Sequence, residues 1–324
     1  MNEKIRQILK YVVTALLAVF FIWLAVRKIE WAEFWQGLTQ TRWGYIVLFL
    51  IASVVALVFR AFRWQKLLQP LEPDTKVIRT WDATNVGNLA NVALPGVGEL
   101  LRCGMVTSPR ATYDKVLGTV LMERIWDVLA IVVLFVVALA LKWNEFGSFF
   151  QDTILAPASG RLSLWWIAVI VLAVGAAAVW AVFHWRHSNK LCGRIAAAVK
   201  GMLEGVGTFF KMDHKLRFAL YTAGLWLMYI LMSYFGLKAI PALSHLGFID
   251  ALFISAVGNI ASVIPGPSGM GPYHYLVMVT LGSLYACTSE IGLLYAVLCH
   301  ETHAILIILL GVISYIHRGV RKKN

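Results

Sequence analysis

Two stretches of the 324-residue sequence decide the fold: GNLANVALPG at residues 87–96 and GNIASVIPG at residues 258–266. They match throughout when Leu is equated with Ile and Asn with Ser, once the extra Ala93 is set aside. Each lies in a longer apolar segment, about 81–103 and 248–285, that Pro, Gly and Asn interrupt. Non-helical backbone at membrane depth survives only where protein or a water-filled cavity satisfies it. Each segment is therefore predicted to form two half-length helices around a Pro-Gly turn.

The composition around these segments is typical of a membrane protein. Hydrophobic residues make up 60% of the chain and charged residues 14%, against about 25% charged residues in soluble domains. This excludes a soluble enzyme, a disordered chain and a disulfide-rich secreted domain. We expect an all-α polytopic membrane protein, with about six transmembrane helices and two opposed re-entrant helical hairpins in an inverted repeat. A single domain would cover residues 1–324. The expected spans are Ile8–Val26, Trp43–Phe59, Val116–Leu141, Leu162–Phe183, Leu216–Leu237 and Ile291–Ile316.

The Lys and Arg residues predict the orientation. The formal net charge is +12, and basic residues concentrate on the cytoplasmic flanks of membrane spans. With the N-terminus inside, 22 basic residues fall on the cytoplasmic side and six outside. We therefore expect a multi-pass protein of a bacterial-type cytoplasmic (inner) membrane, with both termini cytoplasmic. The membrane accounts for the positive charge without a nucleic-acid partner.

Three full spans separate the two repeats, so the repeats would enter the membrane from opposite faces. Inverted repeats with interrupted helices mark the substrate region of many secondary transporters. The alternative is that both hairpins are structural plugs. The loop 190–210 places apolar residues on one helical stripe, which predicts either a helix in the cytoplasmic interface or a solvated connecting helix.

Several motifs resemble the transmembrane, flippase-like region of the lysylphosphatidylglycerol synthetase family. They are Arg60-Ala-Phe-Arg63-Trp64, then Asn91 with Pro95-Gly-Val-Gly-Glu99-Leu-Leu-Arg102, then Glu123-Arg124 with Asp127, and the second Pro-Gly segment. The similarity runs from about residue 10 to 315. In two-domain relatives this region moves a modified phospholipid between leaflets, and a soluble aminoacyl-transferase domain makes it. These 324 residues hold no such domain, so the resemblance implies a stand-alone form that handles lipid without synthesising it.

The resemblance breaks at two positions. In the family the second Pro-Gly segment commonly leads to a glutamate, and an arginine commonly lies in the last span. The sequence has His274 and His300 at these places. Either the site works differently, with imidazoles that titrate near neutral pH and couple protons, or these two positions have no function here.

Ionisable groups inside a membrane are costly unless they are paired or face a cavity. Glu123, Arg124 and Asp127 are spaced to pair on one helix, and Glu99 and Arg102 are one turn apart. For Arg63 alone we expect an ordinary anchor on the cytoplasmic flank. The helix after Pro95 offers free backbone N–H groups to an anion, and Glu99 competes for them. The expected substrate-binding and translocation residues are Arg60, Arg63, Asn88, Asn91, Pro95, Gly96, Gly98, Glu99, Arg102, Glu123, Arg124, Asp127, Asn259, Pro265, Gly266, His274 and His300.

The function expected first is therefore a flippase that moves an anionic phospholipid or lipid-linked headgroup between leaflets. One alternative is an intramembrane serine protease, because Gly266-Pro-Ser268-Gly269 resembles the rhomboid GxSG motif, with His300 or His303 as the base. The other is a non-transporting scaffold for an envelope-lipid enzyme. The histidines of His300-Glu301-Thr302-His303 are three apart rather than four as in metalloproteases. We therefore expect no metal site at these histidines. We also expect no catalytic residue and no cofactor, and the main expected partners are phospholipids.

Overall fold

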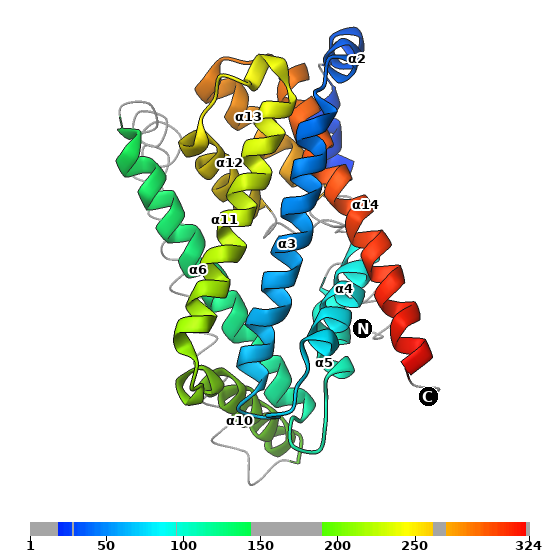
Figure 1. Ribbon diagram of the computed structural model, residues 1–324, viewed down its shortest axis with the longest axis vertical. Helices are drawn as coiled ribbons and strands as arrows, with labels where there is room; N and C mark the ends of the chain where they lie inside the picture. The colour runs from blue at the N-terminus through cyan, green and yellow to red at the C-terminus, as the bar shows by residue number, and fades with distance from the viewer. Residues whose placement is uncertain (1–18, 28, 95, 144–189, 262–269, 322–324) are drawn as a thin grey trace.

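The computed structural model describes residues 19–27, 29–94, 96–143, 190–261 and 270–321. In these ranges the chain is all-α, with no strand (Figure 1). This confirms the expected fold class. Residues 19–26 are helical. The rest of the first expected span and the whole of Leu162–Phe183 lie outside the described residues.

Four described helices are long and apolar enough to cross a membrane. They are α3 (Trp43–Leu68), α6 (Tyr113–Leu141), α11 (Lys215–Ala239) and α14 (Ser289–Arg321). Each matches an expected span. Helices α3 and α11 run side by side in opposite directions (Figure 1), with the rings of Phe62 and Tyr221 stacked at 5.3 Å.

The end of α3 differs from the expected one. The predicted span stops at Phe59, whereas α3 continues through Arg60–Trp64 to Leu68. A span predicted from hydropathy stops at the first charged residues. In the structure, however, Arg63 is buried and contacts two carboxylates. Because pairing offsets the cost of the charge, the helix continues and carries the arginine motif into the protein interior.

The first broken segment forms a hairpin of α4 (Val77–Ala93) and α5 (Val97–Met105). Gly96 has φ +81°, a conformation that suits glycine in the turn. The two arms touch at Gly87 and Gly98: a Cβ on Gly87 would lie 2.8 Å from the Gly98 carbonyl oxygen, and a Cβ on Gly98 would overlap that of Gly87. The side chain of Asn91 then accepts a hydrogen bond from the Gly98 N–H at 2.8 Å. Small residues and one amide thus close the hairpin.

The second broken segment forms α12 (Phe248–Ala261) and α13 (Pro272–Tyr285). Gly258, the repeat partner of Gly87, again lies where the two arms meet, and a Cβ there would lie 2.8 Å from the Tyr273 ring. At the base of this hairpin, buried Asp250 accepts hydrogen bonds from Lys142 Nζ at 2.7 Å, the Tyr285 hydroxyl at 3.0 Å and the Gly247 N–H at 2.7 Å. The matched glycines therefore have matched structural roles.

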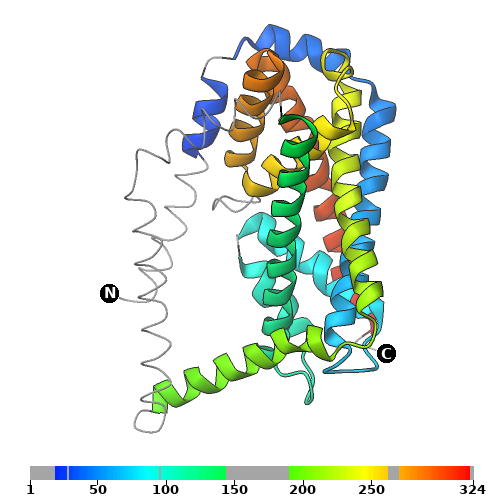
Figure 2. The same cartoon turned by 90° about the vertical axis from the view of Figure 1, so that its left-hand side faces the viewer.

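The two hairpins lie toward opposite ends of the bundle (Figures 1 and 2). The α4–α5 pair starts at the end where α3 finishes, and the α12–α13 pair starts at the end where α11 finishes. This agrees with the inverted arrangement, while the re-entrant insertion of the hairpins into a membrane remains a prediction.

Helix α10 (Lys190–Lys211) lies across one end of the bundle, where α6 begins (Figure 2). It contacts α6 where Gly118 and Gly205 leave no room for side chains. The predicted helix in 190–210 is confirmed, and its orientation fits an interfacial position. At the other end, the short helix α2 (Trp31–Thr39) leads into α3.

Two apolar cores hold these elements together. The larger core packs α12, α13 and the first half of α14 against α11 and α3. The smaller core surrounds Trp64, Leu67 and Cys103, near the opposite end. The charged cluster described next lies beside this smaller core.

Candidate functional site

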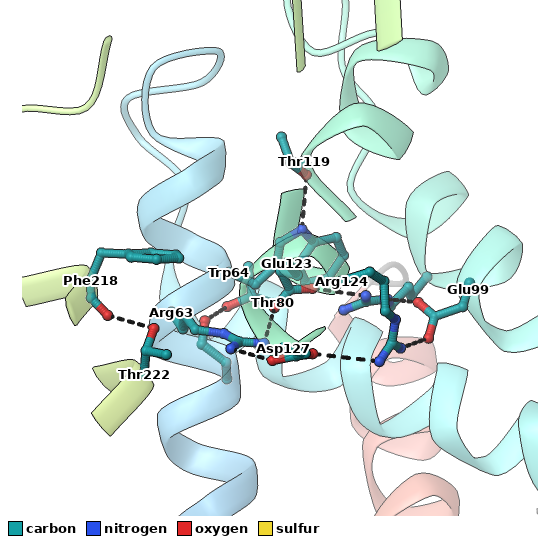
Figure 3. A network of polar contacts seen from close by, with 12 residues as sticks. Arg63, Trp64, Thr80, Glu99, Thr119, Glu123, Arg124, Asp127, Phe218 and Thr222 are labelled. Atoms are coloured by element: carbon teal, nitrogen blue, oxygen red, sulfur yellow. Dashed lines mark hydrogen bonds and ion pairs between the residues drawn. The ribbon is translucent and has the colours of Figure 1, made fainter. Parts of the chain in front are cut away.

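Three helices bring six charged side chains into one closed circuit, which we call the charge ring (Figure 3). Each member contacts a member of opposite charge on either side. In order around the ring, the members are Arg63, Glu123, Arg102, Glu99, Arg124 and Asp127. Arg63 comes from α3, Glu99 and Arg102 from α5, and the other three from α6. The ring therefore ties the first hairpin to two membrane spans.

The inner half of the ring is fully buried. Glu123, with 1% of its side chain exposed, lies 3.4 Å from Arg63 and 2.8 Å from Arg102. Arg63 also donates a hydrogen bond to Asp127 at 2.6 Å. Removing charges from water is costly, and close opposite charges with hydrogen bonds compensate for it. The carboxylate of Glu123 thus offsets the cost of burying the charges of Arg63 and Arg102.

The outer half of the ring reaches the protein surface. Arg124 is 45% exposed and contacts Glu99 and, at 3.6 Å, Asp127. Glu99 is also 2.6 Å from Arg102. Glu99 is therefore shared between a buried arginine and an exposed one, and it links Arg124 of α6 to the first hairpin.

Trp64 holds the buried side of the ring in place. The Arg102 guanidinium lies 4.6 Å from the centre of the Trp64 ring, a cation–π geometry. The Trp64 indole N–H donates to the Thr119 hydroxyl at 3.0 Å, and the Thr80 hydroxyl donates to the Ala61 carbonyl at 2.9 Å. These contacts fix α4, α5 and α6 against α3.

The ring confirms two predicted pairings and corrects one expectation. Arg124 pairs with Asp127, and Arg102 pairs with Glu99, as their spacing predicts. The expectation that Arg63 is a flanking anchor is wrong, because Arg63 is 0% exposed and contacts two carboxylates of α6. Spacing along one helix groups Arg60 with Arg63 and Glu123 with Asp127, but it does not show that α3 and α6 bring Arg63 into contact with these carboxylates.

The hairpin turn is built differently from the expected anion site. The Gly98 N–H already binds the Asn91 side chain, and the Val97 N–H binds the Leu94 carbonyl. The sequence predicted that these two N–H groups at the start of α5 are free to bind an anion. The structure shows that both are already hydrogen-bonded. Asn88 lies half-buried on α4, and Pro95 lies outside the described residues.

The two histidines that depart from the family pattern lie next to each other. The ring centres of His274 and His300 are 4.9 Å apart. Glu301 Oε1 lies 3.5 Å from His274 Nε2 and 3.0 Å from His300 Nδ1. The sequence paired His300 with His303 as a conceivable metal motif, whereas the structure groups His300 with His274 and Glu301, whose ligand atoms all lie within 4.8 Å of one another.

One feature of His274 does not suit a metal at Nε2. The Gly271 N–H points at His274 Nδ1 at 3.4 Å, so Nδ1 is an acceptor and the proton of the neutral ring lies on Nε2. A ligating histidine instead donates its second ring N–H to an acceptor. The arrangement fits an imidazole that donates to Glu301.

The remaining expected residues belong to the second hairpin. Asn259 lies on α12 and donates to the Ser255 carbonyl at 2.8 Å. Pro265 and Gly266 lie outside the described residues, and so does Ser268, on which the protease alternative depends. That alternative therefore stays a prediction.

Comparison with known proteins gives one family. The profile described as "Lysylphosphatidylglycerol synthase TM region" matches residues 7–311. No curated protein and no solved structure matches the chain significantly.

Proposed function

The chain belongs to the lysylphosphatidylglycerol synthase transmembrane-region family, and from this premise we propose that it moves an anionic phospholipid or lipid-linked headgroup between leaflets. The family is one of membrane domains in lipid-modifying, flippase-like proteins. The observation that carries the proposal is the position of Glu99, shared between exposed Arg124 and buried Arg102.

An arriving phosphate group would compete with Glu99 for Arg124. The arginine guanidinium binds phosphate through two parallel hydrogen bonds, much as it binds a carboxylate. When phosphate takes Arg124, Glu99 keeps Arg102 alone, and one of the contacts that hold α5 against α6 is lost. Substrate binding is thereby coupled to movement of the first hairpin.

The surface around Arg124 suits a lipid. Leu121 and Val128 are exposed on the same face of α6 as Arg124, because residues three and four apart share a helix face, and Ile125 is exposed next to them. Acyl chains would lie along this apolar face while the phosphate contacts the guanidinium. The headgroup then meets polar groups at a depth where hydrocarbon alone would oppose it.

The cellular setting is part of the same proposal. The excess of basic residues on one side supports a cytoplasmic membrane location with both termini inside. The sequence shows no P-loop for ATP, so the lipid gradient, an ion gradient or the membrane potential would drive net movement. Phospholipids are the proposed partners, with an envelope-lipid enzyme as a further one.

The test is lipid translocation in proteoliposomes that contain the purified chain. Fluorescent phosphatidylglycerol and phosphatidylcholine are reconstituted separately, and a membrane-impermeant quencher reports the rate at which each lipid reaches the outer leaflet. We expect phosphatidylglycerol to move at least tenfold faster than in empty liposomes. Arg124→Gln should remove most of this acceleration, while Ile125→Leu, the matched change next to it, should keep it.

Two results would count against the proposal. If proteoliposomes and empty liposomes expose anionic lipid at the same rate, with and without a pH gradient, the chain is not a flippase for such lipids. If Arg124→Gln and Ile125→Leu behave alike while transport persists, the route does not use Arg124.

A further inference from the structure

Arg60 lies one turn before Arg63 on α3, and it is not a member of the charge ring. In the described part of the chain it forms no ion pair, and its Nε is shielded from solvent with no hydrogen-bond partner. The three ring carboxylates act on it electrostatically, but each already contacts two ring arginines. Four arginines thus face three carboxylates, and the surplus positive charge is that of Arg60.

A cavity of about 230 Å³ lies between α3, α11, α12, α13 and α14. Its volume is several times the roughly 30 Å³ that one water occupies in the liquid. Besides apolar groups such as Phe49 and Met232, polar side chains line it: Tyr229, Ser233, Ser255, Asn259, His300 and His303. No carboxylate is among the lining residues described.

Two observations connect the cavity to Arg60. Arg60 is not itself one of the lining residues, but Tyr229 and His303, which line the cavity, lie within range of the charge of the Arg60 guanidinium. His303 Nδ1 is buried and has no hydrogen-bond partner in the described chain. Buried polar atoms are normally satisfied, and an orphaned one needs an explanation such as a missing ligand or water.

We propose that this cavity binds a phosphate group, with Arg60 supplying the positive charge. The hydroxyls of Tyr229, Ser233 and Ser255 donate hydrogen bonds to its oxygens, and His303 supplies a further donor. A tetrahedral oxyanion accepts hydrogen bonds on all its oxygens, which matches a lining with several donors and no carboxylate. An anion here also neutralises a charge that membrane depth makes costly.

The ligand chemistry is shared by a lipid phosphodiester and by free phosphate. In its lipid form the inference rests on the proposed function and places a second phosphate position beyond Arg124, next to the second hairpin. Because α12 and α13 line the cavity, a headgroup bound there contacts both halves of the inverted repeat.

The test measures thermal stability by tryptophan fluorescence of the full chain, purified in a neutral detergent and depleted of lipid. The added probes are inorganic phosphate, short-chain phosphatidylglycerol and, as the neutral comparison, short-chain phosphatidylcholine. We expect at least one anionic probe to raise Tm, with phosphatidylcholine much weaker. Arg60→Gln should weaken that response at least tenfold, and Arg60→Lys should restore part of it.

The matched control is Arg42→Gln, which removes an exposed positive charge at the other end of the same helix. The sign of the change without ligand is equally informative. Arg60→Gln removes an unpaired charge and should raise Tm in the absence of anions, whereas Arg63→Gln breaks paired charges and should lower it. If Arg60→Gln cannot be purified, Tyr229→Phe removes one donor and should weaken the response about threefold or more.

Each outcome decides the inference. A response to phosphatidylglycerol alone supports a lipid ligand, and a response to both anionic probes supports recognition of the phosphate group itself. Equal losses in Arg60→Gln and Arg42→Gln would overturn the site, as would no response in the unmodified chain or a lower Tm for ligand-free Arg60→Gln. If the chain translocates lipid but anions do not stabilise it, the cavity site is refuted and the transport proposal stands. If anions stabilise the chain but it does not translocate lipid, the transport proposal is refuted and the cavity site stands.

Discussion

Arg60 and Arg63 are one helical turn apart on α3, yet in the described chain only Arg63 contacts carboxylates. Arg63 contacts Glu123 and Asp127 of α6 directly, whereas these carboxylates act on Arg60 without forming an ion pair with it, and Tyr229 of α11 and His303 of α14 also lie near it. Arg63 therefore holds α3 and α6 together, whereas the positive charge of Arg60 has no ion-pair partner in the described chain.

Glu123→Gln should destabilise the protein strongly. The change removes the anion between Arg63 and Arg102, both buried, and breaking a buried ion pair costs about 3 to 5 kcal/mol. Thermal or denaturant unfolding in detergent measures the loss. Glu204→Gln is the control, because Glu204 forms an exposed pair with Lys115 at 3.1 Å, and such pairs contribute at most about 1 kcal/mol. Similar losses for both variants would show that the ring does not stabilise the bundle.

Gly98→Ala should open the first hairpin. An added Cβ would overlap the Gly87 carbonyl oxygen, so the arms must move apart, at a cost of about 1 to 3 kcal/mol typical of overpacking. Faster amide hydrogen exchange in α5 would report the change. Gly207→Ala is the opposite control, since nothing lies within 4 Å of its added Cβ on α10, and replacing a helical glycine there should stabilise by about 0.5 to 1 kcal/mol. Unchanged exchange in α5 for Gly98→Ala would contradict the close contact.

Asp250→Asn should loosen the base of the second hairpin. The carboxylate accepts from Lys142 and Tyr285 and from the Gly247 N–H, and hydrogen bonds to a charged group contribute about 1.5 to 3 kcal/mol each. The amide keeps the shape but loses the ion pair, so we expect lower Tm and faster exchange in α12 and α13. Glu33→Gln, at an exposed position on α2, should change neither. A loss confined to α11 would disagree with this account.

Single cysteines near the two hairpin turns should label from opposite sides of the membrane. Leu94 and Ile260 are exposed next to the turns, and they avoid the crowded Gly98 position. In sealed vesicles, an impermeant maleimide should reach Leu94→Cys from the cytoplasmic side and Ile260→Cys from the outer side. Labelling of both positions from one side would rule out the inverted arrangement in the membrane.

The native cysteines give this labelling experiment a built-in check. Burial raises the pKa of Cys287 to about 11, and the thiolate is the reactive form. Below its pKa the thiolate fraction grows about tenfold for each pH unit. With the other native cysteines replaced, Cys287 should therefore label slowly at pH 7 and about a hundredfold faster at pH 9. A rate that does not change with pH would show that Cys287 is already ionised.

The hairpins could be predicted from the sequence because their signals are local. Pro95 and Gly96 mark the first turn, and Gly87 and Gly258 mark the places where the arms meet. Such residues indicate local backbone conformations and close backbone approaches, which can be inferred without knowing distant contacts. The end of α3 was misjudged for the opposite reason. Hydropathy counts Arg63 as a cost, and only the distant carboxylates of α6 offset that cost.

The site was predictable as a set of residues but not as a ring. Spacing along one helix gives the Arg124–Asp127 and Glu99–Arg102 pairs, since neighbours three residues apart share a face. The pairing of Arg63 with Glu123 depends on how α3 and α6 are rotated against each other, which no local pattern encodes. The same holds for the contact of His274 with His300, where an alignment to the family drew attention to both positions but could not place them side by side.

The charges carried by the first hairpin also determine how it responds to voltage. Helix α5 carries Glu99 and Arg102, and α4 carries Arg79 and Asp82, so the charges on the two arms cancel. A transmembrane potential does work only on net charge that moves across it. A shift of this hairpin in depth would therefore require no electrical work, and a membrane potential would act on it only through a charged ligand bound to it.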